Sequence, residues 1–267
     1  FSFPFIQRAL VAGVLVSVCA ALLGVPLVLK RYSMIGDGLS HVSFGALAVA
    51  AALGFTPLYF SIPVVIAAAF LLLRVADSPR WNSDAAIAVV SASSLALGVL
   101  VISKTSGMTT DVDNYMFGSV LAMSREDVVL SVALCAAVLA LFALFYHRIF
   151  AVTFDESFSR ATGLKAERYN ALLAILTALT IVLGMRMMGA MLISSLVIFP
   201  ALTAMRLFRS FRGVTLCAAA VSVGCFCVGL AVSFAWSTPV GATVVAAHLA
   251  LFLSAWAVSL IQVRRQR

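Results

Sequence analysis

The sequence predicts an all-α integral membrane protein that crosses the bilayer about nine times. Of its 267 residues, 63% are hydrophobic and only 10% are charged, whereas a soluble domain carries about 25% charged residues. The mean hydropathy is +1.13. The apolar runs are unbroken over roughly 18 to 25 residues, the length of a membrane-spanning helix. Helices are predicted for these runs because backbone groups in lipid must bond to one another within the segment.

The basic residues set the predicted orientation of the spans. With the N-terminus outside and the C-terminus inside, all but four of the 18 Lys and Arg residues face the cytoplasm, as positively charged loops prefer. The four predicted outside are Arg8, Lys104, Arg125 and Arg186. The predicted spans are 8–29, 37–54, 58–74, 84–102, 127–147, 169–187, 190–207, 213–234 and 241–262.

The charge pattern also bears on partners and on metal chemistry. The formal net charge is +8, but the basic residues sit at the ends of apolar runs, which favours membrane topology over nucleic-acid binding. The five cysteines all lie within apolar runs, so they are interpreted as small buried hydrophobes. The sequence has no Walker A motif, so no ATP binding through a P-loop is predicted in this chain. It also lacks the HExxH and GxSxG motifs of hydrolases.

Two connections are longer than simple turns. The outside one, about 103–126, has an apolar second half that could form a re-entrant helix, and its Asp111 and Asp113 lack the rest of a calcium loop. The inside one, about 148–168, predicts a short amphipathic helix capped by Thr153 or Asp155 and ended by Gly163. This helix could lie on the membrane surface or dock a cytoplasmic partner, and the residues alone favour neither.

Asp37 and His41 form the strongest candidate site. They are four residues apart, so they share one helix face, and carboxylate with imidazole suits zinc, manganese or iron(II). Small residues such as Gly45 and Ala48 predict that their span lies inside a bundle. In the alternative interpretation, Asp37 only caps the helix and His41 reaches the polar interface. Ionisable residues inside a membrane bundle are usually functional, and two ligands leave the rest of the site to a second copy of the chain.

The other two histidines give weaker signals. His147 adjoins Arg148 at the predicted cytoplasmic end of a span and is interpreted as interfacial. His248 lies in the last span, where it is a hydrogen-bonded core histidine or a residue of the transport pathway.

Five stretches resemble the membrane permeases of zinc, manganese and iron ABC importers. The most specific is LKRYSMIGDGLSH at 29–41. Four others follow in the same order as in that family: FGSVL at 117–121, DESFSRATG at 155–163, GAMLISSLVIFPA at 189–201 and PVGATVV at 239–245. Gly38 stands where a typical member often has Ala.

The resemblance implies a complete transport assembly in the bacterial plasma (inner) membrane. Residues 1–267 would form one transmembrane permease domain with a fold similar to the vitamin B12 and siderophore importers. It would work as a homodimer, or paired with a related permease, with two cytoplasmic ATPase subunits and an extracellular metal-binding lipoprotein. ATP hydrolysis would reside on the separate subunits, and no cofactor would be permanently bound.

The resemblance also implies roles for individual residues. Asp37 and His41 of both copies would hold Zn²⁺ or Mn²⁺, and Fe²⁺ as a further candidate, in transit, with Ser40 and His248 as candidate supporting or pathway residues. The short inside helix would be the ATPase-coupling helix, with contributions from Asp155, Glu156, Phe158, Ala161, Gly163 and Leu164. The competing interpretations are a permease for a metal chelate, an intramembrane metalloenzyme, and a scaffold in which neither Asp37 nor His41 matters.

Overall fold

The computed structural model describes residues 4–76, 83–105 and 125–265, and this part of the chain is helical, with no strand. Eight of its helices are long and apolar enough to cross a membrane, and the bent pair α6–α7 makes a ninth crossing if counted as one span. The all-α prediction of about nine spans is therefore confirmed. The spanning helices are α1 (Pro4–Leu29), α2 (Ser33–Ala52), α3 (Pro57–Ala76), α4 (Ser83–Lys104), α6 (Arg125–Leu144), α9 (Ala166–Met188), α10 (Ala190–Leu207), α11 (Phe211–Trp236) and α12 (Val240–Arg265).

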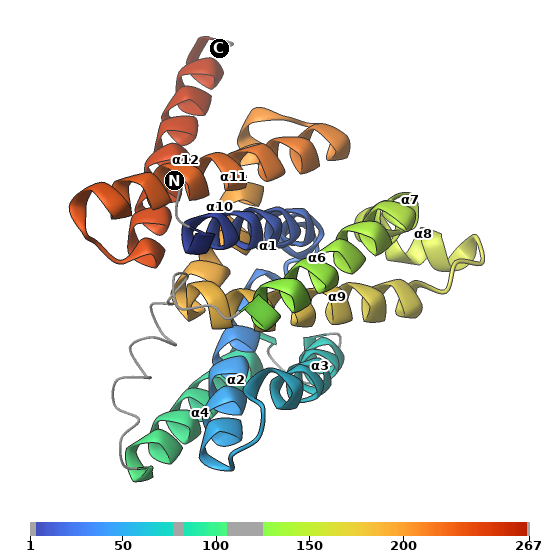
Figure 1. Cartoon of the computed structure of the whole chain (residues 1–267). Helices are drawn as coiled ribbons and strands as arrows, with labels where there is room; N and C mark the ends of the chain where they lie inside the picture. Colours follow the sequence, from blue (N-terminus) through green and yellow to red (C-terminus); the bar gives the residue numbers. More distant parts are fainter. Residues whose placement is uncertain (1–3, 77–82, 106–124, 266–267) are drawn as a thin grey trace.

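The helices form two groups. The two groups are joined where α2 and α3 of the first contact α9, and where α2 contacts α10. In Figure 1, α2, α3 and α4 lie together at the bottom, while α1, α10, α11 and α12 lie above them. In the most apolar windows, 72% of the residues are buried in α2 and in α9, but only 17% in α4 and 22% in α12. The helix that carries Asp37 and His41 is therefore central to the bundle, as its small residues predicted, whereas α4 and α12 present most of their surface outward.

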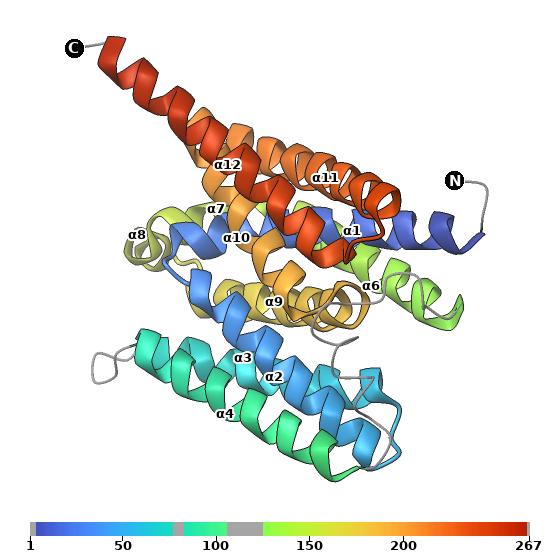
Figure 2. The same cartoon turned by 90° about the vertical axis from the view of Figure 1, so that its left-hand side faces the viewer.

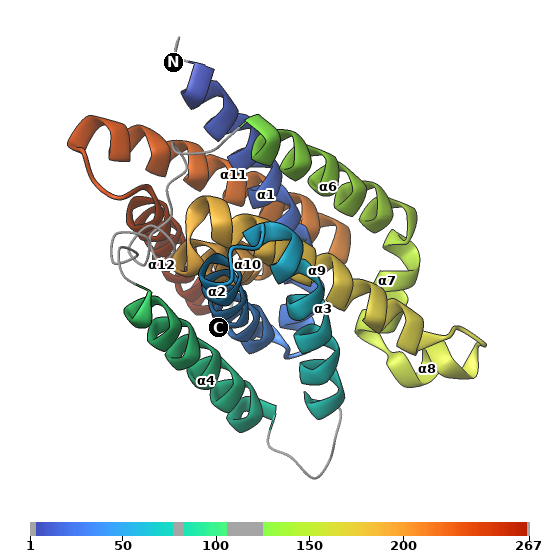
Figure 3. The ribbon, with the colours of Figure 1, turned by 60° about the horizontal axis from the view of Figure 1, so that its bottom comes forward.

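The two ends of the molecule differ in what they carry. In Figure 2, α8 (Glu156–Ala161) and the end of α12 lie to the left, and the start of α1 lies to the right. Figure 3 shows that α8 stands at the edge of the bundle, beyond α7 (Tyr146–Phe154) and α9.

The inside connection is more structured than predicted. The fifth expected span, 127–147, ends early at Leu144, and the chain turns by 67° into α7 before it reaches α8. Aromatic packing accompanies the bend, because the Phe150 ring packs at a tilt against Phe211 of α11 with centroids 5.0 Å apart, and Tyr146 contacts the same ring at 5.4 Å. His147 and Arg148 stay exposed, and Arg148 donates to the Tyr169 hydroxyl of α9 at 2.6 Å. The predicted re-entrant helix, the motif 117–121, Asp111 and Asp113 lie outside the described residues.

Glycines permit the closest helix contact around α2. A Cβ at Gly45 would lie 2.7 Å from the Ser94 carbonyl oxygen of α4, and a Cβ at Gly98 would lie 3.1 Å from the Gly45 Cα. Membrane helices depend on small residues for such approaches, because lipid provides no hydrophobic force between them. The position of α2 against α4 is therefore set by the absence of side chains at this crossing.

We expect Gly45→Ala to lower the stability of the bundle by about 1–3 kcal/mol, the usual cost of overpacking. The matched control is Gly224→Ala in α11, where the added Cβ would meet nothing within 4 Å. Thermal unfolding of the purified protein in detergent measures the difference. If both variants unfold at the same temperature as the parent, the α2–α4 contact is not as close as described.

Candidate functional site

The turn between α1 and α2 is closed by its own backbone. The Tyr32 N–H donates to the Leu27 carbonyl at 2.8 Å, and the Arg31 N–H donates to the Val28 carbonyl at 3.1 Å. These two bonds form a Schellman motif, in which the residue after the helix cap takes the left-handed conformation. Arg31 takes it, with φ of 63°. A non-glycine residue there is strained, so the surrounding bonds hold this turn, which we call the α1–α2 elbow.

Asp37 and His41 follow the elbow on one face of α2. The His41 Nε2 and Asp37 Oδ2 atoms are 3.7 Å apart, and their side chains are 24% and 40% exposed. This separation is too long for a hydrogen bond. Two ligand atoms that each lie ~2.1 Å from a tetrahedral ion are about 3.4 Å apart, so the pair needs little adjustment to hold one cation. Helix rise places His41 about 12 Å along α2 from Ser33, near the middle of the span.

A cavity of about 210 Å³ opens in front of this pair. Its other walls are apolar and come from three helices: Phe44 of α2, Leu95 of α4, and Ala190 and Met191 of α10. Ala190 begins α10 after Gly189, whose φ of 85° turns the chain sharply, and no side chain caps this helix. The cavity therefore meets the N-terminal end of α10, which carries a partial positive charge.

The described part of one copy places only Asp37 and His41 together at this cavity. Among the residues that the structure describes, no group of three or more His, Cys, Asp and Glu side chains could hold an ion. In addition, the His41 Nδ1 atom is buried without a hydrogen-bond partner, although the second ring nitrogen of a metal-bound histidine usually has one. The geometry thus places a carboxylate and an imidazole side by side at a cavity, with atoms of the two types that can bind a metal ion.

Ser40 and His248 are not placed at the cavity. Ser40 is fully buried, donates to the Asp37 carbonyl at 2.7 Å and accepts from Ser194 of α10 at 3.3 Å. It therefore joins α2 to α10 behind the pair. His248 is buried in α12, where its Nδ1 lies 2.9 Å from the Val244 carbonyl and its ring contacts Phe199 at 6.5 Å. The structure does not bring His248 to Asp37 or His41.

The predicted inside helix is α8. It begins and ends with the predicted residues, Asp155 as its cap and Gly163 as its stop. The Asp155 carboxylate accepts from the Phe158 N–H at 2.8 Å and caps the helix, whereas Thr153 instead donates to the Ile149 carbonyl. Gly163, with φ of 85°, ends it in a second Schellman motif, closed by the Leu164 N–H on the Ser159 carbonyl at 3.0 Å. Phe158 is 65% exposed, and Ala161 is exposed as well. The short helix therefore presents an aromatic ring to its surroundings.

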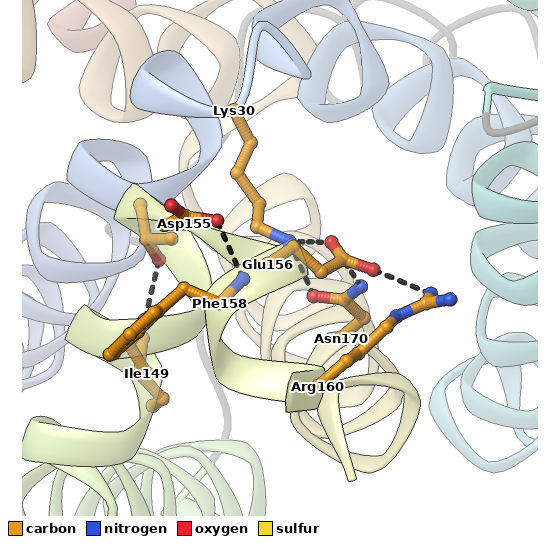
Figure 4. A network of polar contacts seen from close by, with 8 residues as sticks. Lys30, Ile149, Asp155, Glu156, Phe158, Arg160 and Asn170 are labelled. Carbon is orange, nitrogen blue, oxygen red and sulfur yellow. Dashed lines mark hydrogen bonds and ion pairs between the residues drawn. The ribbon is translucent and has the colours of Figure 1, made fainter. Parts of the chain in front are cut away.

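Lys30 was missed as a site residue in the sequence. Its Nζ lies 2.9 Å from Glu156 Oε2 of α8 and donates to Asn170 Oδ1 of α9 at 2.6 Å (Figure 4). Asn170 also donates to Glu156 Oε2 at 3.1 Å, and Arg160 donates to Glu156 Oε1 at 2.7 Å. The Lys30 side chain is only 7% exposed. No local signal marks this contact, because its partners lie 126 and 140 residues away in the chain.

The ionisation of Glu156 reflects this network. Burial by itself raises the pKa of the Glu156 carboxyl, but the hydrogen bonds from Lys30, Asn170 and Arg160 and the positive charge of Lys30 outweigh burial. The pKa is therefore held below its usual value. The carboxylate stays charged at neutral pH, and the ion pair with Lys30 persists.

Comparison with known proteins identifies the family. The sequence model of the ABC 3 transport family matches residues 2–259. The manganese import system permease protein ScaB of Streptococcus gordonii is 29% identical over 94% of this chain and 90% of its own. The high-affinity zinc uptake system membrane protein ZnuB of Haemophilus influenzae is 28% identical over 94% of this chain and 96% of its own.

A solved structure has the same fold. PsaBC from Streptococcus pneumoniae, determined in complex with a Fab, matches with a TM-score of 0.86 and 27% identity over 96% of this chain and 92% of that chain. The candidate spans and these relatives make the protein a multi-pass protein of the bacterial inner membrane. The chain belongs to the ABC 3 transport family.

Proposed function

We propose that this chain is the membrane permease of an ATP-driven importer for a divalent transition metal ion, Zn²⁺ or Mn²⁺, with Fe²⁺ as a further candidate. The observation that carries the proposal is the Asp37–His41 pair, which opens on a cavity near the middle of α2. Relatives named for manganese import and for zinc uptake support it. Oxygen and nitrogen ligands suit both metals, so these ligands leave the choice between them open.

A second copy of the chain would complete the metal site. A two-fold axis beside the cavity would bring two Asp and two His side chains together, which makes the four ligands that zinc prefers. The partly exposed side chains of Asp37 and His41 are consistent with such a shared site. Pairing with a related permease that carries the same residues would give the same ligand set.

The cation would be held weakly, as transport requires. The walls at Phe44 and Leu95 offer no ligand, Met191 offers only a soft thioether sulfur, and the positive end of α10 opposes a bound cation. Alternating access would then expose the site first to an extracellular metal-binding lipoprotein and afterwards to the cytoplasm. The chain itself would catalyse no reaction, and no cofactor would be bound permanently.

The energy would come from two cytoplasmic ATPase subunits that dock on α8. This assignment places α8 and the C-terminus inside and the N-terminus outside. The contact between Lys30 and Glu156 supports it, because the basic residues around the α1–α2 elbow and around α8 then share one side of the membrane. Phe158, Ala161, Gly163 and Leu164 would form the contact, with Asp155 and Glu156 holding the start of the helix.

A permease for a metal chelate fits the cavity less well. Pockets for drug-sized ligands usually measure about 300–1,000 Å³, and the cavity at Asp37 measures about 210 Å³. Uptake of free metal in competition with a siderophore or a corrinoid separates the two functions.

We expect Asp37→Ala or His41→Ala to reduce metal uptake about 10-fold or more, since even residues that only support metal ligands contribute that much to affinity. Uptake of Zn²⁺ and Mn²⁺ into proteoliposomes that contain the permease, its ATPase and its binding protein measures the effect. His147→Ala, which removes an exposed histidine of α7, is the matched control. Normal uptake by a correctly assembled Asp37→Ala variant would exclude the proposed role.

We expect equilibrium dialysis of the purified permease against Zn²⁺ or Mn²⁺ to saturate at about one ion per two chains, because the site is shared across a two-fold axis. His41→Ala should abolish this binding. Saturation at one ion for every chain would show instead that a single copy supplies the complete site.

We expect Phe158→Ala to weaken binding of the ATPase subunits about 10-fold or more, as loss of a central aromatic anchor usually does. The control is Phe234→Ala. It removes a 75% exposed ring near the C-terminal end of α11, a helix that does not include the proposed docking surface. Affinity measured in detergent by surface plasmon resonance distinguishes the variants, and equal affinities would place the docking surface elsewhere.

A further inference from the structure

Lys30 joins three elements that the chain places far apart. It caps the end of α1, and its side chain reaches Glu156 in the first turn of α8 and Asn170 in α9. Figure 4 shows the side chain extending from the elbow to the point where α8 and α9 meet. At 7% exposure, this ammonium group is shielded from competing water, so its ion pair is stronger than one at the surface.

The elbow transfers the position of Lys30 to α2. Lys30 belongs to the Schellman motif that closes the elbow, and the Ile35 N–H donates to the Tyr32 carbonyl at 3.0 Å as α2 begins. Backbone hydrogen bonds therefore restrain the chain continuously from Lys30 to the first turn of α2. Ile35 and Leu39 of α2 also border the same small void as Lys30 and Asn170, which measures about 10 Å³ and has room for about one water molecule. A displacement of Lys30 must move the start of α2 with it.

The other end of the link lies on the proposed docking helix. Glu156 occupies the first turn of α8, two residues before the exposed Phe158. Because Glu156 is itself a residue of α8, its contact with Lys30 is a direct contact with the docking helix. The Lys30 side chain thus joins the helix that would receive the ATPase to the elbow that leads into α2, which carries Asp37 and His41.

We infer that Lys30 is a positioning residue that transmits movement of α8 to α2, and thereby sets the orientation of the Asp37–His41 pair. This inference rests on the proposed function, because it requires ATPase subunits on α8 and a metal ion at the pair. Lys30 itself contacts neither the metal nor the ATPase. Its role is to make the opening of the metal site follow the state of the docking helix.

The test is the amount of metal transported per ATP hydrolysed in proteoliposomes that contain the permease, its ATPase subunits and its binding protein. Lys30→Met keeps most of the length of the side chain and removes the charge. Glu156 then still accepts from Asn170 and Arg160, so the carboxylate is not left unpaired and the bundle should assemble. We expect ATP hydrolysis to continue while metal per ATP falls roughly 5-fold or more, the usual size of coupling between two sites.

Three further variants separate coupling from general damage. Glu156→Gln should lower the ratio as well, and the double variant Lys30→Met/Glu156→Gln should be no worse than Lys30→Met alone, because both remove the same contact. Arg160→Ala breaks the pair inside α8 but leaves Lys30 in place, so it should keep the parental ratio. Lys165→Ala, at an exposed lysine on the same side, is the matched control and should also keep it.

The outcomes distinguish this inference from the proposed function. If the parent protein transports no metal, the proposed function fails. If the parent transports metal and Lys30→Met keeps the parental metal per ATP, the inference is overturned. It is also overturned if Lys30→Met lowers uptake and hydrolysis in proportion, or if Arg160→Ala uncouples as strongly. Should Lys30→Met fail to accumulate, Lys30→Arg and Asn170→Ala provide graded tests, with Lys30→Arg expected to retain coupling and Asn170→Ala to reduce it in part.

Discussion

The cost of placing charge in hydrocarbon governs how this protein is built. An acidic side chain costs up to about 2.5–3.5 kcal/mol at the bilayer centre on insertion scales, and Asp37, about one turn into α2, borders a cavity within the bundle. Lys30 is accepted for another reason, since its ammonium group meets a carboxylate and an amide oxygen. The two charged groups lie seven residues apart on one continuous stretch, and each needs surroundings that distant parts of the chain supply.

This dependence links the proposed metal site to the rest of the architecture. Close packing at Gly45 and Gly98 holds α2 against α4, and Ser40 and Ser194 join α2 to α10. The cavity at Asp37 exists because three helices meet there without filling the space. A shift of any one of them changes the distance between the pair and its apolar walls, so the same contacts that stabilise the bundle also define how well the site can hold a cation.

Features that depend on neighbours in the chain were predictable from the sequence. The spans follow from hydropathy, the cap at Asp155 and the stop at Gly163 follow from local backbone chemistry, and Asp37 and His41 share a face because they are one helical turn apart. The bend after Leu144 was not predictable, because it depends on Phe211 from another helix. The same holds for Lys30, whose partners lie more than a hundred residues away. Arg31 was missed because a left-handed arginine has no sequence signature comparable to glycine.

The N-terminal end of α10 beside the cavity has a kinetic consequence. An importer must let go of its cargo as often as it turns over. At a turnover of about 10 per second and an association rate on the order of 10⁸ M⁻¹s⁻¹, a site with a dissociation constant below roughly 10⁻⁷ M would make release the slowest step. In the proposed importer, a positive helix end that faces the ion would shorten the time the ion stays bound. Tight capture would then fall to the partner that delivers the ion, and rapid release to the membrane chain.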